Sequence, residues 1–307
     1  MNPRIVVMGS VNMDLVVRAP RIPIPGETIL GESLAEYPGG KGANQAVGAA
    51  MAGGQVAMVG CVGDDAFGRS LRASLDQAGV CTSHLAVRGP RSGVALIEVA
   101  ASGENSIVVV PGANALLTHA DAEDALAVMP DADILLLQLE IPMTAVDGAV
   151  RAAKARGMLV LLDPAPACPL SDALLSAVDI LTPNQQEAAL LAGMPAVGVA
   201  DAPEAARRLL ARGVGTVLVK LGADGVLIAS GKTIEHVPGF SVATVDTTAA
   251  GDCMAGALAA ALVAGRAPRD AVVFANAAAA LSTTRQGGQT SMPTLDEIER
   301  FLAGPRD

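Results

Sequence analysis

Aromatic side chains are nearly absent from this sequence. Its 307 residues include no Trp, one Tyr and four Phe, and the formal net charge is −10. Nucleic-acid partners are not expected, because a base-stacking platform needs aromatic rings and a phosphate backbone needs a basic surface. No run of Lys and Arg indicates an anionic membrane as a partner either. A phosphorylated ligand would need a local cradle of hydrogen-bond donors, since the overall charge repels it.

Cysteine and histidine are also sparse. The four cysteines and three histidines are scattered, with no C-x-x-C pair or other metal-ligand spacing. Neither a zinc site nor a disulfide framework is indicated. No apolar leader follows Arg4, and the apolar run after Gly251 is interrupted by glycines and too short to span a bilayer. We therefore expect a cytoplasmic protein with no membrane partner.

Strand-like and helix-like segments alternate along most of the chain, of which 51% is hydrophobic. The pattern predicts strands at 4–9, 55–62, 134–138, 159–163, 180–182 and 216–221. It predicts helices at 43–52, 67–78, 120–128, 143–155, 203–212, 269–284 and 294–301, and a further helix that follows 184–187. Such alternation indicates right-handed crossovers and a parallel sheet. We predict an α/β fold of three layers, in which helices cover both faces of a mostly parallel central sheet.

Two segments depart from this alternation. Residues 15–37 contain three prolines among β-like stretches, and residues 92–111 form two β-rich runs around a turn at 102–105. We predict that they build a small sheet, which acts as a lid over the site. Because such a sheet is marginally stable alone and residues 107–110 are apolar, we expect a homodimer through the lids. No linker divides the chain, so residues 1–307 are predicted to form a single domain.

A loop at 244–252 that opens into an apolar helix is the clearest candidate for chemistry. Ala249, Ala250 and Gly251 are small enough for a ligand to approach the backbone closely. The free N–H groups of a first helical turn form an anion site, and the carboxylate of Asp252 could accept a proton beside it. This combination suits phosphoryl transfer to a hydroxyl group. An ordinary capped helix, with Asp252 matching the helix dipole, explains the stretch equally well.

A glycine-rich loop at 38–44 precedes another apolar helix and offers Lys41 and Asn44 as donors at its start. Glycines at 39, 40 and 42 allow positive φ angles and a close approach to a ligand. By contrast, the segment 225–233 only superficially resembles a phosphate-binding P-loop. Its glycine spacing is wrong, and it is predicted to be two strands joined by a turn at 230–231.

Polar side chains also follow two of the predicted strands, at the end of an open sheet where ligands usually bind. Asn12 and Asp14 point the same way from an extended segment and could together grip vicinal hydroxyls. An Asx-turn at the strand end is an equal alternative. Glu140 follows the strand at 134–138, and a solvated loop acid is its alternative interpretation.

Taken together, these residues resemble the PfkB carbohydrate-kinase family over residues 9–291. Three motifs carry the resemblance: Gly9-Ser-Val-Asn-Met-Asp14, Gly39-Gly-Lys-Gly-Ala-Asn-Gln-Ala-Val47 and Asp246-Thr-Thr-Ala-Ala-Gly-Asp252. It implies ATP-dependent phosphorylation of D-ribose at its 5-hydroxyl, giving ribose 5-phosphate and ADP. Two alternatives remain: a kinase of this family for deoxyribose, fructose, a nucleoside or a keto-deoxy sugar acid, and a sugar-binding regulator without catalysis. The regulator is expected to lack the base or the anion hole, and both are present.

The resemblance also implies a role for each matching residue. Asp252 would be the general base, and Ala249, Ala250 and Gly251 would form the anion hole. The sugar is held by Asn12, Asp14, Gly40, Lys41, Asn44, Glu140 and Asp252. ATP is held by Asn184, Glu187, Lys220, Gly222, Gly225, Gly251 and Asn276, with Asn184 and Glu187 near the phosphates and Mg²⁺. A monovalent cation, K⁺, is held by Asp246, Thr248, Ser282, Arg285, Gly287 and Ser291.

The sequence departs from the family pattern directly after the predicted base. Cys253 and Met254 replace the small residue and the Phe that often stand there. We expect the helix N-terminus to lower the pKa of Cys253, which would then react with thiol reagents faster than the other cysteines. Burial against the sheet would have the opposite effect and leave the thiol inert. Lys220 and Asn276 lie at variable positions of the nucleotide pocket.

Overall fold

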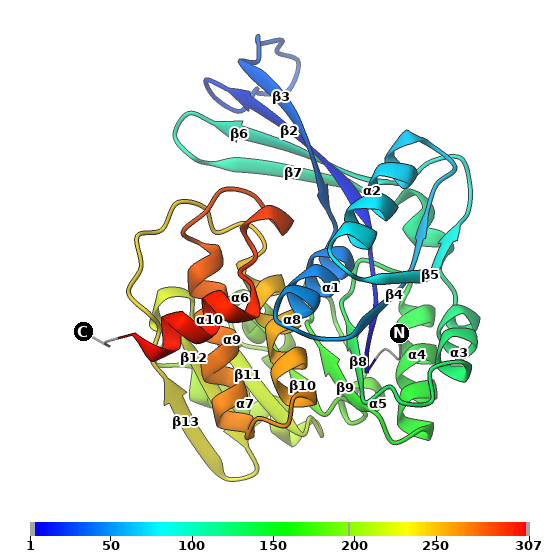
Figure 1. Ribbon diagram of the computed structural model, residues 1–307. Coiled ribbons are helices and arrows are strands. Elements are labelled where there is room, and N and C mark those ends of the chain that lie inside the picture. The colour runs from blue at the N-terminus through cyan, green and yellow to red at the C-terminus, as the bar shows by residue number, and fades with distance from the viewer. Residues whose placement is uncertain (1–3, 196, 305–307) are drawn as a thin grey trace.

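The computed structural model describes residues 4–195 and 197–304, and these form a large and a small sheet (Figure 1). The large sheet has nine strands in the order β13-β12-β11-β10-β9-β8-β1-β4-β5. Their bounds are β1 (Ile5–Met8), β4 (Val56–Val62), β5 (Cys81–Val87), β8 (Ile134–Leu137), β9 (Leu159–Leu162), β10 (Ile180–Leu181), β11 (Thr216–Lys220), β12 (Val226–Ser230) and β13 (Thr233–Val237).

The large sheet is parallel from β11 to β5, and only β12 and β13 pair antiparallel at one edge. Its central strands are almost wholly aliphatic, as in the run Ile134–Leu137, because both faces are covered. Alternate residues face two separate cores: Val6 and Met8 pack into one, Ile5 and Val7 into the other. The predicted mostly parallel α/β arrangement is confirmed.

Helices cover both faces of the large sheet and complete the three layers (Figure 1). One face packs against α3 (His119–Ala127), α4 (Met143–Ala155), α5 (Asp172–Leu175), α6 (Gln185–Ala192) and α7 (Ala202–Ala211). The other packs against α1 (Lys41–Met51), α2 (Ala66–Gln77), α8 (Ala250–Val263), α9 (Pro268–Ser282) and α10 (Leu295–Ala303). No helix within the described ranges combines the length and the apolar character that crossing a membrane would require.

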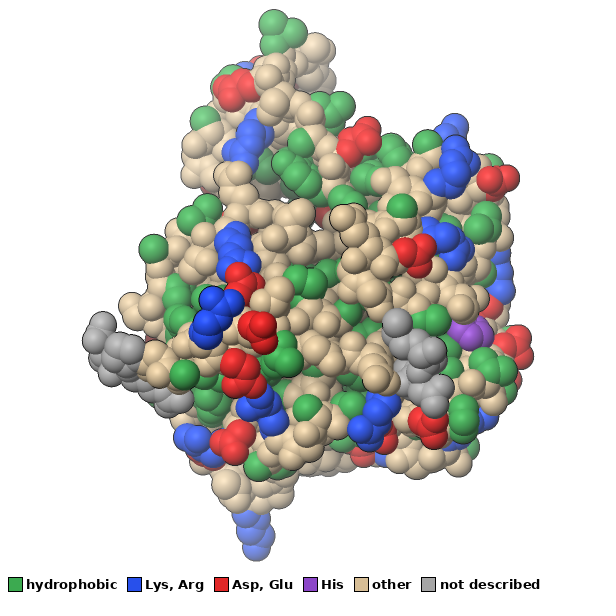
Figure 2. Space-filling model, viewed as in Figure 1, with side chains coloured by type: hydrophobic (Ala, Val, Ile, Leu, Met, Phe, Trp, Pro, Cys, Tyr) green, Lys and Arg blue, Asp and Glu red, His purple; other side chains and the backbone are tan. Residues whose placement is uncertain are grey.

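The small sheet projects from one end of the large one (Figure 1). Its strands, in the order β3-β2-β6-β7, are β2 (Asn12–Ala19), β3 (Ser33–Gly39), β6 (Gly93–Ala100) and β7 (Asn105–Val110). The segments 15–37 and 92–111 therefore do supply a small sheet, as predicted. Figure 2 shows this sheet standing above the body, and on the same face Lys and Arg alternate with Asp and Glu instead of forming a basic patch.

Two short connections hold the small sheet at the carboxyl ends of the large sheet's strands. Only residues 9–11 separate β1 from β2, and only Gly40 separates β3 from α1. Gly40 has φ 86°, and a Cβ there would lie 2.6 Å from the backbone nitrogen of Asn12. A glycine is required at this position for both reasons. The root of the small sheet thus brings Asn12 and the start of α1 together.

Helices α1 and α8 lie in direct backbone contact. A Cβ on Gly256 of α8 would lie 2.6 Å from the backbone nitrogen of Ala49 on α1, so no side chain fits between the two helices there. This contact sets the first turns of α1 and α8 side by side. The two glycine-containing motifs of the sequence, far apart along the chain, meet there.

Two elements were missed by the sequence analysis. Strand β5 lies at the edge of the large sheet, and its mixed sequence from Cys81 to Val87 is only partly buried, so it carries no clear apolar signal. The single-turn helix α5 is shorter than a periodic pattern can reveal. The predicted pair of strands at 225–233 is confirmed as β12 and β13, which rules out a P-loop.

Candidate active site

The first turn of α8 begins with an unusual backbone conformation. Ala249, its N-cap, has φ 58° and ψ 14°, and within the described part of the chain it alone has a positive φ without being glycine. A left-handed conformation costs an L-residue about 1–2 kcal/mol. Of the three residues predicted to form the anion hole, Ala250 donates its N–H to the carbonyl of Thr247 at 3.2 Å. That N–H is therefore engaged within the turn.

Asp252 lies in this turn and is 5% exposed. Its Oδ2 accepts a hydrogen bond from Asn44 Nδ2 at 3.1 Å, and its Oδ1 accepts one from Gln45 Nε2 at 3.0 Å. Both donors belong to α1, so the second and third motifs of the sequence meet at this carboxylate. A role was predicted from the sequence for Asn44 but not for Gln45, although Gln45 stands in the same motif.

The carboxylates of Asp14, Glu140 and Asp252 lie close to the ammonium group of Lys41. Burial, followed by the charges of Glu140 and Asp252, raises the pKa of Asp14 to about 7. The negative charge of Asp252 is the largest cause that raises the pKa of Lys41. Glu140 accepts from Ser10 Oγ at 2.6 Å and from the Lys41 backbone N–H at 3.4 Å. The structure thus brings these predicted sugar-binding side chains together.

Asn12 adjoins this group but is tied to a residue that the sequence analysis did not single out. Its Oδ1 accepts a hydrogen bond from Asn114 Nδ2 at 2.7 Å, and Asn114 also bonds the backbone N–H and carbonyl of Val11. The Asn12 side chain is therefore held in one orientation at the start of β2. Nothing in the sequence around Asn114 marks it, because its partners lie about 100 residues earlier.

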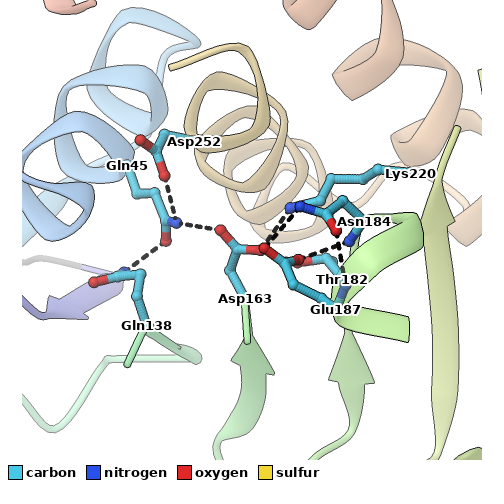
Figure 3. A network of polar contacts seen from close by, with 8 residues as sticks. All are labelled: Gln45, Gln138, Asp163, Thr182, Asn184, Glu187, Lys220 and Asp252. Atoms are coloured by element: carbon cyan, nitrogen blue, oxygen red, sulfur yellow. Dashed lines mark hydrogen bonds and ion pairs between the residues drawn. The ribbon is translucent and has the colours of Figure 1, made fainter. Parts of the chain in front are cut away.

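A second buried cluster links Asp252 to the other half of the sheet (Figure 3). Gln45 Nε2 also donates to Asp163 Oδ2 at 2.9 Å, and Lys220 Nζ pairs with Asp163 Oδ1 at 2.6 Å. Asp163 is the first residue after β9, whereas Glu140 is the third residue after β8. Its place at the carboxyl end of a buried strand could have marked it as a candidate.

Asn184 and Glu187 form a capping box at the start of α6. Asn184 Nδ2 donates to Glu187 Oε1 at 2.8 Å, and the Glu187 backbone N–H donates to Asn184 Oδ1 at 2.9 Å. Burial is the main cause that raises the pKa of Glu187, opposed first by the charge of Lys220. Asn184 also forms a parallel bridge with Lys220, so the capping box stands beside the Asp163 cluster.

A cavity of about 550 Å³ opens on the far side of the first turn of α8 from α1. Its mainly apolar wall includes Phe240 and Met254. The cavity collects five of the seven residues predicted to bind the nucleotide: Lys220, Gly222, Gly225, Gly251 and Asn276. The side-chain Nδ2 of Asn276 donates a hydrogen bond to the carbonyl of Pro238 at 2.9 Å, and the side-chain oxygen takes no part in this bond.

The residues predicted to bind K⁺ are brought together only in part. Asp246 Oδ1 accepts from the N–H and hydroxyl of Thr248, and its Oδ2 accepts from the Gly287 N–H at 2.9 Å. Ser282 and Ser291 direct their hydroxyls to nearby carbonyls. Arg285 turns away and pairs with Glu297 at 2.6 Å. Any cation here would therefore meet chiefly backbone carbonyls.

The prediction that Cys253 reacts faster than the other cysteines is wrong. Cys253 is buried, and burial raises the pKa of its thiol to about 12. Desolvation of the thiolate outweighs the helix N-terminus because no water reaches the sulfur. The alternative that the sequence analysis left open, a buried and inert thiol, is the one the structure supports.

Comparison with known proteins gives consistent matches along the chain. The family model of the pfkB family carbohydrate kinases matches residues 2–295. A ribokinase of Haemophilus influenzae is 41% identical over 98% of this chain and 99% of its own length. The structure of Arabidopsis thaliana ribokinase complexed with ribose and ATP superimposes with a TM-score of 0.92 at 35% identity, covering 99% of this chain and all of that one. A deoxyribokinase of Salmonella typhi is 35% identical over 97% of this chain and 98% of its own length.

Proposed function

The chain belongs to the pfkB family of carbohydrate kinases, and on that premise we propose that it transfers the γ-phosphoryl group of ATP to the 5-hydroxyl of D-ribose. The products are ribose 5-phosphate and ADP. One observation carries the proposal: Asp252 is held by amides of the glycine-rich motif on one side and adjoins the wall of a ligand-sized cavity on the other. The ribokinases of H. influenzae and A. thaliana support ribose as the sugar.

The reaction we propose is an in-line displacement at the γ-phosphorus. The carboxylate of Asp252 takes the proton of the 5-hydroxyl while that oxygen forms its bond to phosphorus. The bond from phosphorus to the oxygen shared with the β-phosphate breaks, and the electron pair leaves with ADP. The two amide donors aim the carboxylate, and the first turn of α8 faces the negative charge on the transferred group.

The cavity beside Asp252 fits ATP. Its volume of about 550 Å³ lies within the range of small-molecule sites. Its apolar wall at Phe240 and Met254 suits a base, and Lys220 beside Gly251 suits phosphate oxygens. The ammonium of Lys220 is already paired with Asp163, so part of its charge is shared between the two partners.

The donor set also fits Mg²⁺ brought in with the nucleotide. Within residues 4–195 and 197–304, no group of three or more His, Cys, Asp or Glu side chains is placed so that it could hold a metal ion by itself. Mg²⁺ does not need one, because it keeps several waters and takes one or two carboxylates together with substrate phosphates. Asn184 and Glu187 would hold it. When bound, Mg²⁺ neutralises charge on the phosphate oxygens.

Potassium would act from the loops around Asp246. The Asp246–Gly287 hydrogen bond joins the segment before the anion hole to the loop at 285–291. Carbonyl oxygens with one carboxylate suit a large monovalent cation. We propose that K⁺ stiffens the turn before Ala249 and so raises turnover more than sugar affinity.

The small sheet carries the proposed dimer contact. Strand β7 is an edge strand of this sheet, and its residues Ile107 and Val108 are 53% and 58% exposed. An exposed apolar edge strand tends to pair with another chain. We propose that two small sheets pair and thereby cover both sugar sites. Since the reaction consumes ATP, we also propose that it takes place in the cytoplasm.

The substrate is tested with a sugar panel in a coupled ADP assay. Ribose, 2-deoxyribose, fructose and a nucleoside are compared with ATP and Mg²⁺ at equal concentrations. We expect the highest kcat/KM with ribose. A preference for 2-deoxyribose would favour the activity named for the S. typhi relative instead. Sugar binding without ADP release from any substrate would support the regulator and refute the kinase.

A further inference from the structure

Gln138 is a buried polar side chain to which the proposed reaction assigns no role. It follows β8 directly and is fully buried. Its Nε2 donates a 2.6 Å hydrogen bond to Gln45 Oε1. Its own Oε1 has no hydrogen-bond partner and lies against Gly9, where any side chain would clash with it. Burying an acceptor without a partner is costly, so this arrangement calls for a physical reason.

The reason lies in the amide of Gln45, which stands between two carboxylates (Figure 3). Its Nε2 donates one hydrogen to Asp252 at 3.0 Å and the other to Asp163 at 2.9 Å. Turned over, the amide would instead present its oxygen to both carboxylates and repel them. Lys220 compensates the charge of Asp163 at 2.6 Å, which leaves the Gln45 amide as the neutral link between the two acids.

The orientation of Gln45 in turn requires a donor at the opposite end of its amide. Gln45 Oε1 is directed away from the acids, and Gln138 Nε2 is the donor that meets it. Gln138 can donate in this direction only by directing its own Oε1 toward Gly9. The unpartnered oxygen is therefore the consequence of holding Gln45 in the one orientation in which its amide donates to both Asp252 and Asp163.

We propose that Gln138 is a positioning residue for phosphoryl transfer, which acts through Gln45 to hold the carboxylate of Asp252 aimed at the sugar hydroxyl. This rests on the proposed function, in which Asp252 is the general base. In Figure 3 a dashed line joins Gln138 to Gln45 and none joins it to Asp252 or Lys220, so an effect of its hydrogen bond on turnover must pass through the amide of Gln45.

A double-mutant cycle tests this route. Gln138→Met and Gln45→Met are made singly and together, because methionine keeps the length of glutamine without its donors. We expect Gln45→Met to lower kcat by about tenfold to a hundredfold and Gln138→Met by about tenfold, since a misaimed catalytic group costs turnover. The Kd for ribose, measured by calorimetry, should change by less than about twofold, because the sugar hydroxyls meet other side chains. The double variant should be no slower than Gln45→Met alone.

Controls separate positioning from packing. Leu137→Met changes the adjacent buried residue of β8 and should leave kcat unchanged. If Gln138→Met does not fold, as judged by circular dichroism, Gln138→Asn replaces it, because the shorter amide cannot reach Gln45. Wild-type kcat in the Gln138 variant, or losses that multiply in the double variant, would overturn the proposal while leaving the kinase intact. No turnover of ribose by the wild type would refute the proposed function and this inference with it.

Discussion

Asp14 should make ribose binding depend on pH near neutrality. Burial and the charges of Glu140 and Asp252 raise its pKa from 3.8 to about 7 in the folded protein. If the sugar hydroxyls donate to the ionised carboxylate, each proton taken up by Asp14 competes with the sugar. The apparent Kd is then the intrinsic Kd multiplied by one plus ten to the power of 7 minus the pH. From pH 8 to pH 6 this factor rises from about 1.1 to about 11, or about 1.4 kcal/mol.

The same shift predicts an opposite effect on stability without sugar. Between pH 3.8 and about 7 the folded state binds a proton that the unfolded state does not, so the contribution of Asp14 to stability grows as the pH falls through about 7. At pH 8 the buried charge costs at most about 4 kcal/mol, from about 3 pKa units at about 1.36 kcal/mol each. Asp14→Asn should therefore stabilise the apoprotein at pH 8 while it weakens ribose binding.

The assay for Asp14 is calorimetry with ribose at pH 6, 7 and 8, combined with urea unfolding of the apoprotein at the same pH values. Asp14→Asn is the control, and its weaker ribose binding should not vary over this range. A wild-type Kd that stays constant from pH 8 to pH 6 would refute the reasoning. So would an Asp14→Asn variant that is less stable than the wild type at pH 8.

Four further predictions follow from the site. Asp252→Asn should keep the fold and lose about 10²–10⁴ in kcat, and near-normal turnover would contradict a general base there. At constant ionic strength, K⁺ should raise kcat relative to Li⁺ with little change in ribose Kd, and Asp246→Ala should abolish the difference. Val108→Lys, on the exposed edge strand, should give monomers in sedimentation at micromolar concentration, whereas an unchanged dimer would place the contact elsewhere. In native protein, mass spectrometry should find Cys253 labelled by thiol reagents more slowly than Cys81, and equal labelling would contradict its burial.

The sequence predicted well those features that depend on neighbours in the chain. The aliphatic strands and their alternation with helices indicated the parallel sheet, and the start of α4 at Met143 was placed correctly. The short motifs marked Asp252 and Asn44 as candidates, because the residues of each motif lie on one loop or one helix turn. Strand β5 was missed because an edge strand is only half buried and need not be apolar.

The contacts between motifs could not be predicted from the sequence. Gln45 meets Asp163 and Asp252 across 118 and 207 residues, and Gln138 meets Gln45 across 93. Such pairs are set by which strands neighbour each other, and no local pattern encodes that. The sequence leaves the reactivity of Cys253 open for a related reason: its place at a helix start is visible in the sequence, whereas the packing that excludes water from it is not.

The short connections at the root of the small sheet link sugar selectivity to the position of that sheet. Residues 9–11 and Gly40 join that sheet to the large one, and β2 begins with Asn12 immediately after the first of these joints. Asn114 braces the same joint from the connection that follows β7. A sugar that makes no hydrogen bond to Asn12 or Asp14 would therefore leave the small sheet less firmly held above the reacting hydroxyl. We expect poor substrates to be distinguished by slow turnover more than by weak binding, so a sugar can occupy this pocket as a competitor without being consumed.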